Sequence, residues 1–517
     1  MLIYLTVLAL TLAVLWVRKR YSYWKERGIP YVEPSFPSGN IRGMGRKEHF
    51  STQMQRCYKE LKGKGPVGGV FFFINPVALA MDLDFIKTVL VKDFQYFHDR
   101  SIYYNEKDDP LSAHLVALEG TKWKNLRAKL TPTFTSGKMK SMYPTIIGVA
   151  EEFQKMMESE VGSNTEIEMK DVLARFTTDV IGTCAFGLEC NSLHDPDAQF
   201  RRMGRKIFAI AKGRFVKLIA AQQFRSLARS LHVTLIDKEV SDFFIGAVKD
   251  TIKYREENNI ERNDFMSLLM KLKKVDNSDN TGEDSEALTD EQIAAQAFVF
   301  FLAGFETSST AMSNSLYELA QNSELQDKAR KSVMDSIKKH GSLTYEAIQD
   351  MQYIDQCING KKLCYIKYFK SLINKLISTE SLRKYPPASN LTRIVSKDYK
   401  LPNCDVVLQQ GSTIIVPVYA LHHDAEYYPN PEKYDPDRFT PEEVAKRNPY
   451  CFLPFGEGPR NCIGMRFGIM QARVGLAYLL KDFSFTLSSK TPVPLKISPH
   501  NPILTSEGGL WLNVEKL

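Results

Sequence analysis

FGEGPRNCIG, residues 455–464, is the stretch of this 517-residue sequence that decides its fold class. Its three glycines let the backbone come close to a flat group, and backbone N–H groups around a thiolate would stabilise its negative charge. A lone cysteine is more often a buried, inert thiol. In this loop, however, Cys462 is a candidate metal ligand.

A second motif lies upstream, where residues 303–307 read AGFET inside a long apolar stretch. The pattern predicts a helix over about 291–320 that begins at a capping box of Thr289 and Gln292. Gly304 in a helix interior costs about 1 kcal/mol relative to alanine, so some other requirement must favour it. Taken alone, Thr307 would be expected to bond back to its own helix.

Together these motifs resemble two signatures of the cytochrome P-450 family, the cysteine loop F-x-x-G-x-R-x-C-x-G and the helix motif A-G-x-[DE]-T. Phe455, Gly458, Arg460, Cys462 and Gly464 fill every specified position of the first. The resemblance implies a mainly α fold with small β-sheets and a haem b whose iron is bound by Cys462. It also implies that Phe455 packs near the sulfur and that Arg460 pairs with a haem propionate.

The resemblance assigns roles to further residues. Glu306 and Thr307 would be the catalytic residues that relay protons during oxygen activation, and the glycine before them would open room for oxygen. Trp123 and Arg127, at i and i+4 on one helical face, and Arg393 match positions that hold the propionates in this family.

Glu380, Arg383 and Arg438 match the family's buried charged triad, which is structural. In the family, the sequence ending at Asn359 runs directly into Glu380 as one helix. Here about 20 residues, Gly360–Thr379, intervene. If they continued the helix, Glu380 would move ~30 Å along it and turn to nearly the opposite face. The insert must therefore loop out for the triad to form.

The ends of the insert, Gly360-Lys361-Lys362 and Thr379-Glu380, can be encoded by in-frame splice signals, and its interior residue types have AT-rich codons. We hypothesise that the insert is a retained intron. The alternative is a genuine insertion. If the insert disrupts the helix, the chain would be an inactive isoform or a non-catalytic haem- or ligand-binding protein.

Residues 1–20 are expected to be a membrane anchor. The first 17 residues carry no charge and would span about 25 Å as a helix, slightly less than a ~30 Å hydrocarbon core. Positive charge follows this run, whereas in a cleaved signal peptide it precedes it, so a retained anchor and a cytosolic body are favoured. Prolines in residues 21–40 predict a stiff hinge that spaces the body from the bilayer. Residues 41–517 are expected to form a single haem-binding catalytic domain.

The composition is that of a folded protein, with 44% hydrophobic and 25% charged residues. The net charge of +8 is modest and the basic residues are scattered among acidic ones, so a nucleic-acid partner is not supported. The sequence lacks a G-x-G-x-x-G nucleotide-binding unit. The resemblance therefore implies electrons from NADPH through a separate NADPH-cytochrome P-450 reductase, sometimes helped by cytochrome b5, at the endoplasmic reticulum membrane.

Two stretches, residues 31–37 and 300–310, resemble the insect microsomal branch of the family. That branch is associated with the oxidation of plant toxins, insecticides and other lipophilic compounds. The resemblance thus implies a xenobiotic-metabolising monooxygenase, an oxidoreductase that inserts one atom of O2 into a lipophilic substrate. An endogenous lipid or steroid remains an alternative substrate.

Two other features are open to more than one interpretation. His422-His423-Asp424 resembles a metal cluster but is expected to be polar surface. The basic, apolar stretch 201–229 is either an ordinary surface helix pair or a membrane-dipping gate of the kind this family has.

Overall fold

The computed structural model describes the chain except residues 164, 209–211, 274–286, 351–372 and 403–404. It is mainly helical, as predicted. The helices of the described part are α1 (Leu2–Tyr21), α2 (Tyr23–Glu26), α3 (Phe50–Leu61), α4 (Leu83–Lys87), α5 (Gly120–Leu130), α6 (Ser136–Ser163), α7 (Met169–Ile181), α8 (Gln199–Phe208), α9 (Lys212–Gln223), α10 (Arg225–Ser230), α11 (Lys238–Glu257), α12 (Phe265–Lys273), α13 (Asp290–Ala320), α14 (Ser323–His340), α15 (Tyr345–Asp350), α17 (Ile373–Lys384), α18 (Val418–His422), α19 (Pro441–Ala445) and α20 (Met465–Asp482).

Three small sheets accompany these helices in the described residues. One has the strand order β1-β2-β7-β4, with β2 and β7 parallel and the other pairs antiparallel. A second has the order β3-β9-β8, and β5 pairs with β6. The strands are β1 (Val67–Phe72), β2 (Asn75–Ala80), β3 (Glu166–Glu168), β4 (Leu391–Ile394), β5 (Tyr399–Lys400), β6 (Val407–Leu408), β7 (Thr413–Val416), β8 (Phe483–Leu487) and β9 (Trp511–Lys516).

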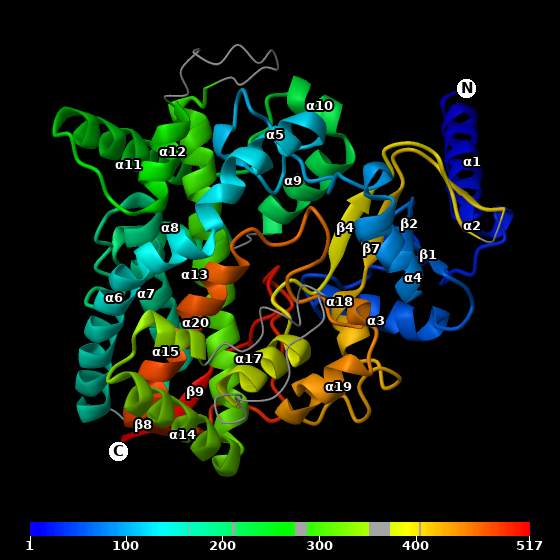
Figure 1. The fold of residues 1–517 in the computed structure, drawn as a ribbon. Helices are drawn as coiled ribbons and strands as arrows, with labels where there is room; N and C mark the ends of the chain where they lie inside the picture. Colours follow the sequence, from blue (N-terminus) through cyan, green and yellow to red (C-terminus); the bar gives the residue numbers. More distant parts are fainter. Residues whose placement is uncertain (164, 209–211, 274–286, 351–372, 403–404) are drawn as a thin grey trace.

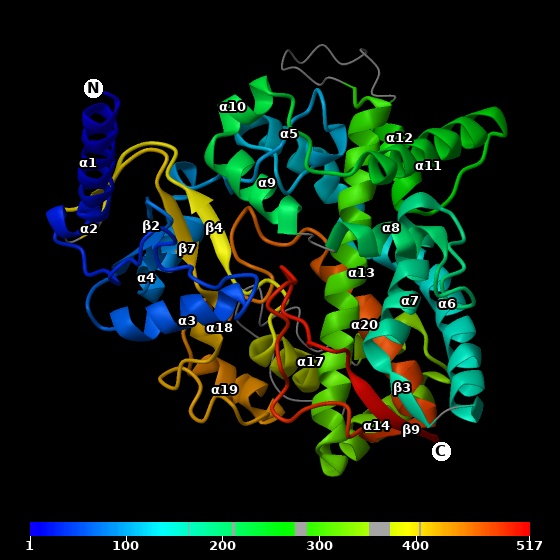
Figure 2. The same cartoon turned by 180° about the vertical axis from the view of Figure 1, so that it is seen from behind.

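Helix α13 runs through the middle of the molecule, with α6, α7, α8 and α11 on one side and the four-stranded sheet, α3 and α1 on the other (Figures 1 and 2). The predicted capping box is confirmed: the Gln292 N–H donates to Thr289 Oγ1, and the Thr289 N–H donates to Gln292 Oε1. Most of α13 is buried, because α7, α11, α17 and α20 pack around it. Residues on α13 are therefore held from several sides.

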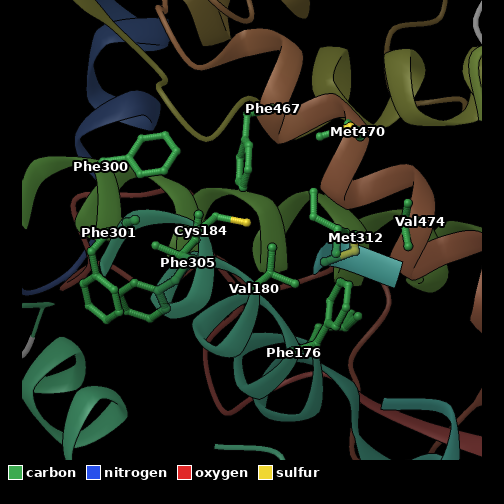
Figure 3. Packing of buried hydrophobic residues seen from close by; sticks show 14 of the residues in the cluster. Phe176, Val180, Cys184, Phe300, Phe301, Phe305, Met312, Phe467, Met470 and Val474 are labelled. Atoms are coloured by element: carbon green, nitrogen blue, oxygen red, sulfur yellow. The ribbon is translucent and has the colours of Figure 1, made fainter. Parts of the chain in front are cut away.

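Aromatic rings and methionines fill the space between α13, α7 and α20 (Figure 3). Phe300 lies against Phe467 of α20 with ring centroids 5.2 Å apart. Two glycines allow the helices to approach. A Cβ at Gly304 would lie 2.4 Å from Ile181 Cδ1, and one at Gly475 would lie 2.6 Å from Met312 Sδ. Close packing against α7 is thus the requirement that favours a glycine at position 304.

Helix α1 is the part of the described chain that is long and apolar enough to cross a membrane, and none of its residues is buried. Its last turn carries Arg18, Lys19 and Arg20. An exposed apolar helix followed by basic residues is typical of a membrane anchor.

The segment after α1 packs against the four-stranded sheet, in contrast to the spacer predicted for residues 21–40. Trp24 is 1% exposed, and its Nε1–H donates to the Val70 carbonyl at 3.0 Å. Its ring fills the space that a side chain at Gly69 would need. The Gly69 N–H donates to the Pro30 carbonyl at 2.7 Å. The segment is therefore part of the hydrophobic core that packs on the four-stranded sheet.

Replacing Trp24 with alanine should lower the free energy of unfolding by about 3–5 kcal/mol, the usual cost of removing a buried aromatic side chain. Chemical unfolding of the detergent-solubilised protein would measure the loss. Trp16→Ala is the matched control, because Trp16 lies on α1 and is 55% exposed. Equal stability of the two variants would contradict the docked arrangement.

Candidate functional site

A cavity of about 480 Å³ lies between α13, α5, β4 and the loop of residues 453–464. Its walls are largely apolar and include Phe134, Val299, Phe300 and Phe467. Such a volume with apolar walls is typical of a small-molecule site. The predicted site residues Trp123, Arg127, Thr307, Arg393, Phe455, Arg460, Cys462 and Gly464 all line it, whereas Glu306 does not.

The cysteine loop is shaped by two glycines in the left-handed region. Gly456 and Gly458 have φ of 69° and 74°, and a Cβ at Gly458 would lie 1.9 Å from the Leu90 carbonyl oxygen. The Cys462 N–H donates to the Phe455 carbonyl at 2.9 Å. Gly464 has a negative φ and is the N-cap of α20. The loop therefore folds back on itself and presents Cys462 just before a helix begins.

The Cys462 side chain is exposed to the cavity and enclosed by protein on its other sides. Burial raises the pKa of this thiol above its ordinary value, and a hydrogen bond from the Gly464 backbone and the charges of Arg100 and Arg127 only partly offset that increase. Nearby N–H groups and cations stabilise a thiolate relative to a thiol. Because the pKa stays raised, the thiolate form would need a further cation, such as a metal ion, at the sulfur.

Five of the residues that line this cavity are arginines: Arg100, Arg127, Arg393, Arg460 and Arg473. Burial, together with repulsion between neighbouring arginines, lowers the pKa of Arg393 and of Arg460 to about 9 and that of Arg100 to about 10. Burial also lowers the pKa of Arg127. The described residues that line the cavity include no aspartate or glutamate. A site with this charge favours an anionic ligand.

The arginines differ in how many protein groups they bind. Arg460 donates to the carbonyls of His98, Leu115 and Leu118, and its guanidinium lies 3.9 Å from the centre of the Trp123 ring.

Arg127 donates to the carbonyl and side chain of Asn461. Arg393 donates only to the Thr392 carbonyl among the described partners, and its buried Nε has none. Arg393 thus has hydrogen-bonding capacity to spare for a ligand.

These features fit a haem group. The thiol faces an apolar space, and the arginines supply charge that would neutralise two carboxylates. Arg100 was not among the site residues predicted from the sequence. It lines the cavity and donates to the Arg460 carbonyl at 2.6 Å.

The opposite wall of the cavity is α13. The Thr307 hydroxyl donates to the Ala303 carbonyl at 2.6 Å, as expected for a threonine inside a helix. Glu306 is turned away from the cavity, and its Oε1 lies 2.6 Å from Lys170 Nζ on α7. Both groups of this ion pair are largely buried. The structure therefore places only Thr307 of the predicted relay at the cavity.

The structure brings the three predicted triad residues together. Arg383 donates two hydrogen bonds of 2.7 Å to Glu380, and both side chains are fully buried. Arg438 Nε lies 3.6 Å from Glu380 Oε1, and the Asp435 N–H donates to the same oxygen at 3.0 Å. Most of the Gly360–Thr379 insert lies outside the described residues. Its last residues, from Ile373, form the first part of α17.

His422-His423-Asp424 differs from its prediction as polar surface. The three residues are 0%, 5% and 8% exposed. No group of metal-binding side chains is found among the described residues. The sequence gives little indication of this burial because the stretch is short and polar.

Comparison with known proteins agrees with this geometry. The sequence model of the family described as cytochrome P-450 matches residues 30–359 and 371–512, so residues 360–370 of the insert lie outside the match. The chain is 45% identical over 511 residues to probable cytochrome P-450 6a14 of Drosophila melanogaster, with 96% of each chain covered. It is 43% identical over 521 residues to cytochrome P-450 6A1 of Musca domestica, covering 100% of this chain and 98% of the relative. The chain therefore belongs to the cytochrome P-450 family of haem monooxygenases.

Proposed function

We propose that the Cys462 sulfur would bind the iron of a haem group and that the apolar space between it and α13 receives a lipophilic substrate. The observation that carries this proposal is the position of Cys462 in the cavity, with Ala303, Gly304 and Thr307 also in its lining. Thiolate ligation favours O–O cleavage, so haem bound here would supply oxygen activation. The side chains around the cavity would bind the haem and deliver protons.

Arg100, Arg127, Arg393 and Arg460 are the proposed partners of the propionates. Paired carboxylates would supply the negative charge that the cavity lining lacks, and a guanidinium binds a carboxylate through two parallel hydrogen bonds. Arg393 is the strongest candidate because its Nε is buried without a partner. Trp123 would hold the Arg460 guanidinium in place through its ring.

Thr307 and Glu306 are the proposed members of a relay that would pass protons from solvent water to the cavity. The Thr307 hydroxyl can exchange its bond to the Ala303 carbonyl for one to a group in the cavity. Glu306 is adjacent in sequence but paired with Lys170. Rotation of Glu306 away from Lys170 would bring a carboxyl group toward Thr307, so the ion pair would control when protons arrive.

Helix α1 supports a membrane location, and the sequence, which lacks a strand–G-x-G-x-x-G–helix nucleotide-binding unit, supports a separate protein as the electron donor. An apolar helix with basic residues at its end would hold the enzyme in the endoplasmic reticulum membrane, with residues 41–517 as a catalytic domain in the cytosol. Electrons would come from NADPH through a membrane-bound reductase, with cytochrome b5 as a second donor. Plant toxins, insecticides and endogenous lipids or steroids are the proposed substrate classes.

The reduced carbon monoxide difference spectrum tests ligation by Cys462. Membranes that contain the chain as written and a form lacking Gly360–Thr379 should both give a thiolate-type Soret band, because the triad forms in the presence of the insert. Cys462→Ala should abolish the band. Cys451→Ala is the control, because Cys451 is buried away from the cavity.

A band from the shortened form alone would identify the written chain as an inactive product of a retained intron. Absence of the band from both would contradict haem-thiolate ligation. Messages sequenced across codons 360–379 test the intron hypothesis separately.

Glu306→Gln should lower product formation by about 100-fold, the usual contribution of a positioned proton donor. NADPH consumption should fall less, since reduction continues without productive proton delivery. Product formed per NADPH consumed is the measurement. Glu291→Gln is the control, because Glu291 lies on the same helix and pairs with Lys249 at the surface. Unchanged coupling in Glu306→Gln would rule out the relay.

Arg100→Met should have opposite effects on the two forms of the protein. Without haem, removing one of several crowded buried cations should raise the thermal unfolding temperature. With haem, the loss of a propionate partner should speed haem release by about tenfold. Arg202→Met, at an exposed position on α8, is the control. If Arg100→Met stabilises the protein both without and with haem, or destabilises it in both forms, the result would argue against a propionate role.

A further inference from the structure

His422 ends α18 and is completely buried, although the proposed chemistry gives it no role. Its Nδ1 lies 3.1 Å from the Arg383 carbonyl oxygen, and its Nε2 accepts a 2.9 Å hydrogen bond from the Leu453 N–H. Its ring stacks on Phe452 with centroids 5.1 Å apart. The imidazole therefore lies between the triad helix α17 and the beginning of the cysteine loop.

The two partners fix the tautomer of this ring. A carbonyl oxygen only accepts, so Nδ1 must carry the proton, and a backbone N–H only donates, so Nε2 must be bare. Burial and the charge of Arg383 lower the pKa of His422 to about 3, which keeps the ring neutral. Both nitrogens are therefore used, and neither can change its role without losing a bond.

Backbone hydrogen bonds continue from this ring to the cysteine. The Leu453 carbonyl accepts from the Gly456 N–H at 3.1 Å, which closes the first turn of the loop. The Phe455 carbonyl accepts from the Cys462 N–H at 2.9 Å. Thus the residue that His422 binds also begins the turn that leads to Cys462.

The connection to the triad is reciprocal. Arg383 Nη1 donates to the His422 carbonyl at 2.8 Å, while the His422 ring donates to the Arg383 carbonyl. Arg383 itself is fixed by Glu380. One side chain therefore couples the buried ion pair to the loop that carries the cysteine.

We propose that His422 is a positioning residue that sets the cysteine loop relative to the triad helix, acting through its hydrogen bond from Leu453. This inference rests on Cys462 as the iron ligand. Without that bond the Leu453 N–H is buried and unpaired, so the first turn of the loop shifts or loosens. The sulfur then loses its fixed position, and the bond from sulfur to iron weakens.

Two substitutions at position 422 distinguish the effects of the two hydrogen bonds that the imidazole makes. His422→Gln can place an acceptor near the position of Nε2 and keep the bond to Leu453, whereas His422→Asn can keep only the donor toward Arg383. His423→Asn is the matched control. His423 is also buried with its pKa lowered to about 3, but within the part of the chain that the structure describes its Nδ1 bonds to the Tyr419 carbonyl, one turn earlier, and not to the cysteine loop.

The experiment compares these variants in the full-length, haem-loaded protein. One measurement is the fraction of thiolate-type band in the reduced carbon monoxide complex. The other is the rate of haem transfer to excess apomyoglobin. We expect His422→Asn to release haem about tenfold faster and to lose part of the thiolate band, as for other groups that orient metal ligands. His422→Gln and His423→Asn should stay close to the parent protein.

Several outcomes would overturn the proposal. If His422→Asn behaves like the parent, the bond to Leu453 does not position the loop. If His422→Gln or His423→Asn is impaired as much as His422→Asn, the effect is one of general packing. A parent protein without the thiolate band would contradict Cys462 ligation itself, and the inference with it.

Discussion

The buried ion pair between Glu380 and Arg383 lies within α17, and the remaining hydrogen bonds of its two side chains join this helix to residues 422–435. Both side chains are fully enclosed, and removing water from such charges is costly unless every hydrogen bond is made. Arg383 meets this requirement by reaching the carbonyls of His422 and Pro431, and Glu380 accepts from the Asp435 backbone. Helix α17 and the irregular chain before the cysteine loop are therefore fixed to each other. Because the hydrogen bonds of this ion pair fix α17 to the chain before the cysteine loop, they also restrict the position of that loop.

The lining of the cavity combines two kinds of side chain. Phenylalanines from α13 and its neighbours supply apolar surface, while arginines from separate segments supply positive charge. The guanidinium groups come from the loop at Arg100, from α5 and from β4, so no single element carries the charge. Haem likewise combines an apolar macrocycle with two carboxylates at one edge.

Local patterns explain what could be predicted from the sequence. The Cys462 loop, the capping box of α13 and the E-x-x-R pair each occupy a short stretch, so motif and spacing were sufficient. Arg100 is different, because an irregular loop has no periodicity and only the folded chain brings it to Arg460. The direction of Glu306 could not be predicted from its position on the helix, because neighbouring helix residues can line the same cavity, as Thr307 and Ser308 do. Its pairing with Lys170 of α7 depends on how the two helices pack. The burial of His422 depends on contacts with residues far apart in the chain.

The docking of Trp24 has a practical consequence for preparing a soluble form of the enzyme. Removing the apolar residues of α1 takes away exposed side chains and leaves the core of the sheet intact. Cutting after residue 40, where the predicted hinge ends, would remove Trp24 and leave the space over Gly69 unfilled. It would also strip the Pro30 and Val32 backbone from the edge of β1. The useful boundary therefore lies before Tyr23, within the charged end of the membrane helix.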